Sequence, residues 1–446
     1  MGQTKAMKGM KVLFVCQRVP YPPNKGEKLR TYHQIDYLTQ HGVDVDVLAL
    51  AESQSDEQDC AALAQHVSRA KCVRLPHKLL RYLTALTHGW AISEGYFYSD
   101  QMQAIFNEWV AETEYEAVIL SASSLYRYAQ CSGLLPQGMS QMGGGEILYQ
   151  PKRILFDFMD VDSDKWSQYA DAASWPMSWV YRRESKKVAE LERRALIDAD
   201  KVFLIAEKER ELFVSAHQPN HENLEAMDLK KALDERVEVM GNGIDQRVFF
   251  PASQDRTGDT PLTRFLFVGV MDYKPNVEAM LWFVEYVWPS IKMHYPKASL
   301  SIVGMNPVKE IRKLDTRHDI QVTGRVDDVV PYFHQADVFV APFQIARGVQ
   351  NKILQAMACG LPVLGSSLGF EGIEMTHGKE GFVCNDVSAY LSALADLQDS
   401  ILYQDVVTQA ERLIDTRYSW AGQLQALAEQ LSTEQRDDEY MKQVCA

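Results

Sequence analysis

The sequence lacks several features that would place it in whole classes of protein. It has no surplus of positive charge, since 46 lysines and arginines stand against 60 aspartates and glutamates, a formal net charge of −14. A nucleic-acid-binding protein normally carries a basic surface, so no nucleic-acid partner is expected. No apolar run approaches the roughly 18 residues that a transmembrane helix needs.

Cysteine patterns are also missing. The seven cysteines are odd in number and scattered, and they form no CxxC pair or Cys/His cluster. Neither a disulfide framework nor a zinc site is therefore expected. The N-terminal residues run directly into a strand-like segment, without a long apolar core or a small-residue cleavage site, which favours a cytoplasmic protein.

The length of 446 residues suits two domains, and strand-like and helix-like segments alternate through both halves. Continuous apolar runs that end in a glycine, a proline or a small residue predict buried parallel strands. They lie at 11–17, 43–50, 117–120, 153–159 and 201–206, and then at 265–269, 300–304, 320–324, 338–342 and 362–366.

This alternation predicts an α/β protein with two Rossmann-like, doubly wound parallel sheets facing a cleft. We place the first domain at 1–238 and the second at 239–415. Residues 416–446 form C-terminal helices that can cross back to the first domain. Neither half carries GxGxxG after its first strand, so a dinucleotide-binding oxidoreductase has little support.

In an open α/β sheet, ligands bind outside the carboxyl ends of the strands. The second half places glycines and polar side chains there, and we expect them to bind a donor ligand. These residues are Gly269, Lys274, Asn276, Gly304 and Arg325.

The segment ARGVQNKILQAMACG (346–360) looks like a loop that leads into a helix. Free N–H groups at a helix start favour an anion, and Arg347 and Lys352 would add positive charge to a diphosphate site. Gln355 lies one turn further along the same face, where an attached ribose would reach it. The alternative is a surface helix with two solvated cations. The remaining residues assigned to this site are Gly348, Val349, Gln350 and Asn351.

Two groups of residues in the first half are candidates for the acceptor side of the cleft. Lys25, Gly26 and Arg30 follow the first strand, where a Pro-Gly turn without a ligand is the alternative. Asp157 and Asp160 follow a later strand, and helix capping or solvation would explain them equally well.

The segment 75–90, LPHKLLRYLTALTHGW, has apolar residues at helical spacing and basic residues near one end. Such a helix can make peripheral contact with an anionic membrane. A helix that covers the sheet of the first domain would show the same pattern.

Several segments together resemble glycosyltransferase family 4. In the second half they are GNGID, FVGVMDYKPN, LSIVG, VTGRVDDVVPYF, ADVFVAPF and RGVQNKILQAMACGLPV, in the family's order. In the first half, PYPPNKGEKLR and FMDVDSDKW resemble the sugar transferases associated with exopolysaccharide and exosortase (PEP-CTERM) systems. The resemblance spans roughly residues 10–425.

The resemblance implies a GT-B fold and a nucleoside-diphosphate sugar as donor, bound mainly by the second domain. It implies a retaining transfer to a glycan or lipid-linked glycan acceptor, with no metal or cofactor, in exopolysaccharide biosynthesis at the inner face of the membrane. Two donor-binding glutamates of the wider family fall on Arg347 and Gln355. The glutamine at 355 predicts weaker donor binding, because an amide lacks the charge-assisted hydrogen bond that a carboxylate forms with a ribose hydroxyl.

Two other functions fit the same sequence. A nucleotide-sugar epimerase of this fold would act on the sugar ring without an acceptor. A non-catalytic protein that binds a nucleotide sugar would show binding without turnover, and the glutamine at 355 is its one support. Fold alone does not decide among these.

Overall fold

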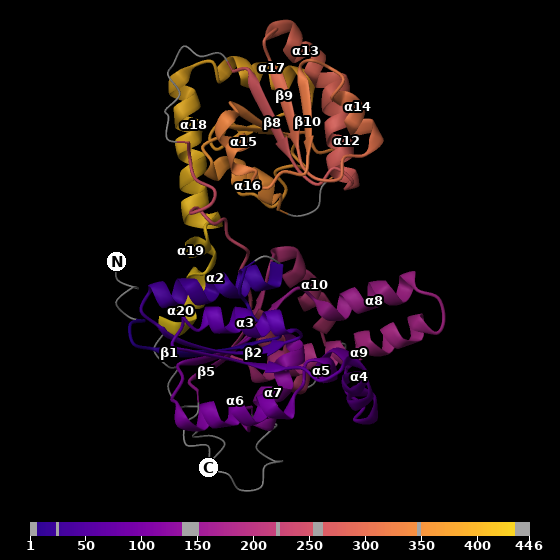
Figure 1. The fold of residues 1–446 in the computed structure, drawn as a ribbon, viewed down its shortest axis with the longest axis vertical. Coiled ribbons are helices and arrows are strands. Elements are labelled where there is room, and N and C mark those ends of the chain that lie inside the picture. The colour runs from indigo at the N-terminus through magenta and orange to yellow at the C-terminus, as the bar shows by residue number, and fades with distance from the viewer. Residues whose placement is uncertain are drawn as a thin grey trace. The chain divides into compact units, whose positions relative to one another are not determined.

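The structure is a computed structural model that describes residues 7–23, 26–135, 151–219, 224–252, 262–345 and 349–432. The chain divides into two compact units. The first contains residues 1–242 together with the segment from Leu424 onward, and the second runs from Gly243 to Gln423. Each unit is built on its own parallel β-sheet with helices packed around it (Figure 1).

In the described part of the first unit, seven parallel strands form one sheet in the order β3-β2-β1-β4-β5-β6-β7. Their bounds are Lys11–Cys16 (β1), Asp44–Ala51 (β2), Arg69–Arg74 (β3), Ala117–Leu120 (β4), Arg153–Met159 (β5), Lys201–Leu204 (β6) and Val237–Val239 (β7). The strands predicted from apolar runs are the central ones, because a strand covered by helices on both faces needs apolar side chains on both.

Helices lie on both faces of this sheet, with α2 and α3 on one and α6 and α7 on the other (Figure 1). Along the chain they are α2 (Gly26–Gln40), α3 (Gln54–Leu63), α4 (Lys78–Thr87), α5 (Ile92–Tyr96), α6 (Asp100–Glu112), α7 (Tyr126–Cys131), α8 (Asp162–Ala172), α9 (Met177–Asp198), α10 (Glu207–His217) and α11 (Leu224–Arg236). A short 3₁₀ turn, η1 (Ser123–Leu125), precedes α7.

The described part of the second unit holds six parallel strands in the order β10-β9-β8-β11-β12-β13. Their bounds are Arg264–Val268 (β8), Ser299–Val303 (β9), Ile320–Gly324 (β10), Val338–Ala341 (β11), Val363–Gly365 (β12) and Phe382–Val383 (β13). From β8 the chain adds β9 and β10 on one side, and it then returns to add β11, β12 and β13 on the other side of β8. Where a doubly wound sheet changes direction in this way, a crevice forms beyond the carboxyl ends of the two central strands.

The helices of this unit follow the strands in alternation. They are α12 (Lys274–Trp282), α13 (Trp288–His294), α14 (Lys309–Leu314), α15 (Val330–Gln335), α16 (Asn351–Ala358), α17 (Val387–Asp396), α18 (Ser400–Leu413) and α19 (Trp420–Gln423). The π-helical turns η2 (Phe283–Val287) and η3 (Ile414–Tyr418) continue α12 into α13 and end α18.

Asp337, at the start of β11, fixes the two central strands of the second sheet. Its buried carboxylate accepts hydrogen bonds from the backbone N–H groups of Thr263 and Arg264, at 2.9 and 2.8 Å. The Arg264 guanidinium adds an ion pair of 2.7 Å. A buried carboxylate with this many donors is satisfied, so it stabilises the pairing that positions the strand ends.

The C-terminal helix α20 (Gln425–Ser432) belongs to the first unit. It buries Leu427, Ala428 and Leu431, and the Gln430 side chain donates a 3.5 Å hydrogen bond to Glu238. The chain changes unit at Gln423–Leu424, within the segment 416–446 that we expected to form the last helices. None of the described helices is long and apolar enough to span a membrane.

Candidate functional site

The carboxyl ends of β8 and β9 approach each other so closely that the residue at 304 must be glycine. A Cβ added at Gly304 would lie 1.7 Å from the carbonyl oxygen of Gly269. A Cβ added at Gly269 would lie 2.8 Å from the Asn276 amide nitrogen and 3.1 Å from the Lys352 ammonium. The glycines therefore bring two loops and the start of α16 against each other at the ligand-binding edge of the sheet.

Lys352 lies at the centre of this arrangement. Its ammonium donates a 2.6 Å hydrogen bond to the Asn276 side-chain oxygen. The Asn276 amide nitrogen donates in turn to the Val270 carbonyl, at 2.8 Å, which fixes the side chain with its oxygen toward the lysine. The Phe267 and Phe343 rings lie 5.2 and 5.0 Å from the ammonium and form its apolar surround.

Burial lowers the pKa of the Lys352 ammonium from its usual 10.5 to about 8. Among the described residues, no carboxylate lies within ion-pair distance of it. Lys352 is half-buried. A partly desolvated cation without a counter-charge is costly, and a lysine in this state is typical of a functional site. An anionic ligand would supply the missing charge.

Helix α16 presents its N-terminus next to this lysine. Its N-cap residue, Gln350, makes no side-chain cap hydrogen bond, so the first N–H groups of the helix are not capped by that side chain. Val349 and Asn351 are exposed beside it. Arg347 and Gly348, which we predicted to complete this anion site, lie outside the described residues.

Gln355 is half-buried, one turn along α16 from Lys352. The apolar face of the helix packs into the core through Ile353, Leu354, Ala356, Met357 and Ala358. No hydrogen bond of the Gln355 side chain is found within the described ranges. Its amide is therefore available to a ligand, as the expected ribose contact requires.

Two other predicted donor residues do not join this contact set. The Lys274 side chain is 76% exposed and forms an ion pair of 3.5 Å with Glu278 on the outer face of α12. Arg325 is exposed after β10. Of the two polar side chains at the start of α12, Asn276 faces Lys352 and Lys274 faces solvent.

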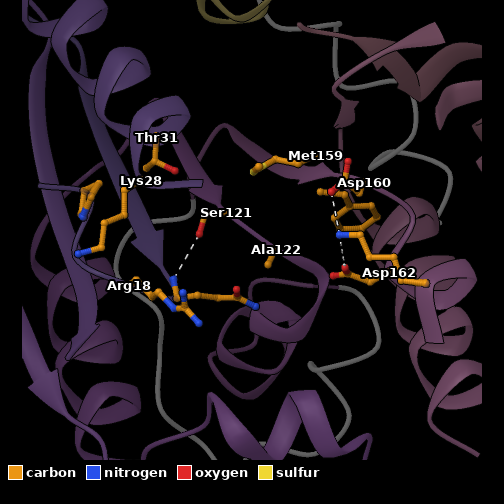
Figure 2. A pocket seen from close by; sticks show the side chains of 12 residues that line it. Arg18, Lys28, Thr31, Ser121, Ala122, Met159, Asp160 and Asp162 are labelled. Atoms are coloured by element: carbon orange, nitrogen blue, oxygen red, sulfur yellow. Dashed lines mark hydrogen bonds and ion pairs between the residues drawn. The ribbon is translucent and has the colours of Figure 1, made fainter. Parts of the chain in front are cut away.

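The first unit carries a pocket of about 160 Å³ where β1, β4 and β5 end. Figure 2 shows Arg18 and Lys28 on one side and Asp160 and Asp162 on the other, with Ser121 and Ala122 between them. The lining is completed by Gln17, Pro20, Thr31, Phe158, Met159 and Lys165.

On one wall of this pocket, the negative charges of two carboxylates face the positive charge of a lysine. The Lys165 ammonium lies 2.7 Å from Asp160 and 3.3 Å from Asp162. Burial raises the pKa of Asp162, and the lysine opposes that shift. Next to them, Met159 has a φ of +65°, a left-handed conformation that a non-glycine residue adopts at a cost, often at functional sites.

The burial of Arg30 and Asp157 does not fit the prediction that both side chains meet an acceptor. They are 0% and 2% exposed, and the guanidinium contacts the carboxylate at 2.7 and 2.8 Å. Each neutralises the other inside the domain. Asp160 does line the pocket, Gly26 begins α2, and Lys25 lies outside the described residues.

The polar residues that follow β1 and β4 line the pocket but were not among the predicted site residues. Arg18 and Ser121 each come immediately after a predicted strand, which was the signal applied to the second half. Lys28 and Thr31 reach the pocket from α2, where helical spacing alone does not distinguish them from other polar residues.

Comparison with known proteins identifies the second unit. Residues 263–400 match the family model described as glycosyl transferases group 1. This part of the second unit is similar to a glycosyltransferase domain. The matched range contains Gly269, Asn276, Gly304 and Lys352, so the contacts described above lie within the segment that resembles this family.

Two curated relatives resemble the chain over part of its length. An uncharacterized 44.6 kDa protein in the cps region of Klebsiella pneumoniae is 27% identical over 129 residues, 27% of this chain and 33% of the relative. A glycogen synthase of Mycobacterium tuberculosis is 26% identical over 195 residues, 41% of this chain and 45% of the relative. The matches thus span less than half of each relative.

Solved structures match across both units. Anabaena HepE in complex with UDP has a TM-score of 0.56 at 14% identity, covering 95% of this chain and 100% of that one. Sucrose-phosphate synthase of Thermosynechococcus elongatus has a TM-score of 0.53 at 15% identity, covering 94% and 98%. The two parallel-sheet units and these neighbours confirm the predicted GT-B fold.

Proposed function

We propose that this protein is a retaining glycosyltransferase that moves a sugar from a nucleoside-diphosphate sugar to a glycan or lipid-linked glycan acceptor. The observation that carries the proposal is Lys352, a half-buried lysine whose ammonium has no carboxylate partner among the described residues and lies beside the start of a helix at the carboxyl ends of the second sheet's strands. A diphosphate has the charge and the size to fill that place.

The donor would lie with its diphosphate at Lys352 and the N-terminus of α16, and its ribose toward Gln355. Lys352 would stabilise the negative charge that develops on the diphosphate as the sugar leaves, and Arg347 would add a second cation. Preorganised charge of this kind is often the largest catalytic contribution. The complexes of HepE with UDP and UDP-glucose support a uridine nucleotide as the first donor to test.

The acceptor would bind in the pocket of the first unit, because that pocket is also formed where parallel strands end. Asp160 and Ser121 offer an acceptor and a donor of hydrogen bonds to sugar hydroxyls. Front-face attack without a metal ion, with the donor phosphate taking the acceptor proton, is the mechanism that membership of family 4 would imply.

The biological setting we propose is exopolysaccharide synthesis, as in the PEP-CTERM-associated branch of family 4. The support is the resemblance of segments in both halves of the chain and the relative from a cps region. A polysaccharide built on a lipid carrier would place the reaction at the inner face of the membrane.

The direct test is transfer from a panel of nucleotide sugars to glycan and lipid-linked acceptors, preceded by a thermal-shift screen that selects the donor by ligand stabilisation. The proposal requires both donor stabilisation and an acceptor-dependent product. A change in the sugar without any acceptor would identify an epimerase instead. Donor binding with no product over the whole panel would identify a non-catalytic nucleotide-sugar-binding protein.

A further inference from the structure

The hairpin formed by α8 and α9 ends in an uncovered group of large apolar side chains. Trp175 is 83% exposed and Trp179 is 64% exposed, and Tyr169 and Met177 are exposed beside them. No residue from 171 to 183 is buried, whereas the buried stripe of α9 begins at Glu184. In Figure 1 this end of the hairpin projects from the sheet of the first unit.

The two helices of the projecting end are joined by aromatic contacts and hydrogen bonds. The Trp166, Tyr169 and Tyr181 rings contact one another across the two helices, with centroids 5.6 to 6.1 Å apart. Nearer the domain, the buried Glu192 carboxylate accepts hydrogen bonds from the Ser163 backbone N–H and hydroxyl. The two tryptophans are therefore presented on an ordered support, which reduces the entropy that a binding partner would have to overcome.

The side chains around the tryptophans carry a small excess of positive charge, in a chain that is strongly negative overall. Residues 171–190 contain four basic side chains, Arg182, Arg183, Lys186 and Lys187, and three acidic ones. Two of the acidic side chains form surface ion pairs, Asp171 with Arg182 at 3.8 Å and Glu190 with Lys187 at 3.4 Å. Glu184 is 0% exposed and accepts hydrogen bonds from the backbone N–H groups of Ile92 and Ser93. The solvent side of the first turns of α9 therefore presents tryptophan next to arginine and lysine.

We propose that the α8–α9 tip docks on an anionic lipid bilayer, with Trp175 and Trp179 in the head-group region and Arg182 and Lys186 against the lipid phosphates. Indoles prefer the membrane–water interface because one edge is polar and the ring is apolar. Basic side chains near the surface add attraction to anionic lipids. A few side chains on a projecting end suit a bilayer better than a protein, since a stable protein interface buries about 800 Å² per partner.

This surface differs from the one that the sequence suggested at 75–90. Arg81 in that segment is 4% exposed and stacks on the Tyr96 ring at 3.8 Å, so its charge is used inside the domain. The docking inference goes beyond sugar transfer and does not depend on it, because lipid binding is measured without donor or acceptor.

The test is sedimentation of the full-length protein with two kinds of vesicle, phosphatidylcholine alone and equal parts of phosphatidylcholine and phosphatidylglycerol. Binding to the anionic vesicles, with a blue shift of tryptophan fluorescence, is the expected result. Trp175→Ser with Trp179→Ser should weaken it by about tenfold or more, because each indole loses its apolar burial. Tyr286→Ser with Ile401→Ser, which removes two exposed apolar side chains of the second unit, is the matched control and should bind like the wild type.

A second variant tests how much of the vesicle binding comes from the basic side chains and not from the tryptophans. Arg182→Glu with Lys186→Glu should remove the preference for anionic vesicles, whereas Lys297→Glu with Lys313→Glu on the second unit should retain it. Equal sedimentation of the wild type and the tryptophan variant would overturn the proposal. So would a wild type that ignores both vesicles but self-associates in a way that the tryptophan variant abolishes, which would make the tip a protein interface.

Discussion

The Lys352 ammonium and the Asn276 amide oxygen are joined by a 2.6 Å hydrogen bond across 76 positions of the sequence. Asn276 is held by the loop after β8, and Lys352 extends from the first turn of α16. This contact couples the loop after one central strand to the helix that follows its neighbour in the sheet. Because asparagine is neutral, it orients the lysine without neutralising it, and the charge stays available to a ligand.

Lys352→Met should have opposite effects on ligand binding and on stability. Donor affinity should fall by about 10- to 100-fold, because a hydrogen bond to a charged group contributes roughly 1.5–3 kcal/mol. The unliganded protein should be as stable as the wild type or more so, because a half-buried charge without a counter-charge is removed. Calorimetry with UDP and denaturant unfolding measure the two quantities.

The matched control is Lys297→Met, which removes an exposed lysine just before β9. This position lies at the amino ends of the strands, whereas Lys352 lies at their carboxyl ends. It should leave both quantities unchanged. If Lys352→Met binds the donor as tightly as the wild type, the phosphate assignment is wrong.

Donor binding should weaken as the pH rises through about 8. The Lys352 ammonium has a pKa of about 8 in the free protein, so it is charged below that pH and loses its charge above it. The donor dissociation constant should therefore rise with pH from about 8 upward. Lys352→Arg keeps its charge throughout this range and should flatten the profile, because the guanidinium pKa is above about 12.

The same pKa gives a stability prediction of defined sign. Between pH 8 and 10.5 the unfolded chain binds more protons at Lys352 than the folded protein does, so stability should rise with pH through this window. Below pH 8 Lys352 is charged in both the folded and the unfolded protein, so its full unfavourable contribution to the free energy of unfolding is present there. Lys352→Met should remove this part of the pH dependence in denaturant unfolding.

Gly304→Ala should damage both the fold and the site. The added methyl would lie 1.7 Å from the Gly269 carbonyl oxygen, so β8 and β9 must separate where their loops meet Lys352. A strained backbone costs about 1–3 kcal/mol, and donor affinity should fall with it. Denaturant unfolding and UDP calorimetry measure the two effects.

Gly324→Ala is the control for backbone conformation alone. Gly324 ends the neighbouring strand with a φ of +70° and has no atom within 4 Å of an added Cβ. It should cost only about 1–2 kcal/mol and leave donor affinity intact. Equal losses of affinity in both variants would show that the close approach of Gly304 and Gly269 does not shape the site.

Gln355→Glu should lower the donor dissociation constant, by up to about tenfold, because a carboxylate forms a stronger hydrogen bond to a ribose hydroxyl than an amide does. Gln321→Glu, an exposed position on β10, adds the same charge outside the site and should not improve binding. An unchanged or higher dissociation constant at position 355 would mean that this glutamine does not face the ribose.

Much of the fold could be predicted from the sequence because central parallel strands must be apolar on both faces. The edge strand β3, RAKCVR, has no apolar run because one side of it is open, and it was missed. β13 has two residues and gives no periodic signal. Runs of apolar residues therefore predict the central strands of a sheet better than its edge strands.

The candidate site could be predicted only at the level of loops. Strand ends and glycines indicated the segment after β8, but nothing local shows that Asn276 turns inward while Lys274 points to solvent. The pairing of Arg30 with Asp157, 127 positions apart, depends on β5 lying beneath α2. Both facts arise from tertiary packing, which a single sequence does not record.

Variants of Arg30 and Asp157 can distinguish whether this buried ion pair stabilises the fold or binds the acceptor. Removing one member of a buried, bidentate pair leaves an uncompensated charge, so Arg30→Met should destabilise the protein by about 3–5 kcal/mol. The double variant Arg30→Met with Asp157→Leu should recover most of that loss, since two apolar side chains can replace a buried ion pair. Denaturant unfolding of the four proteins gives the coupling energy directly.

An exposed ion pair serves as the reference for the stability loss expected at Arg30. Arg417 and Glu374 form an ion pair of 3.1 Å whose side chains are 60% and 68% exposed, and Arg417→Met should cost at most about 1 kcal/mol. If Arg30→Met unfolds like the wild type yet loses sugar transfer, Arg30 contacts the acceptor after all. If it loses stability and the double variant regains both stability and transfer, the pair serves to hold α2 against β5, and the acceptor is bound by the residues that line the pocket.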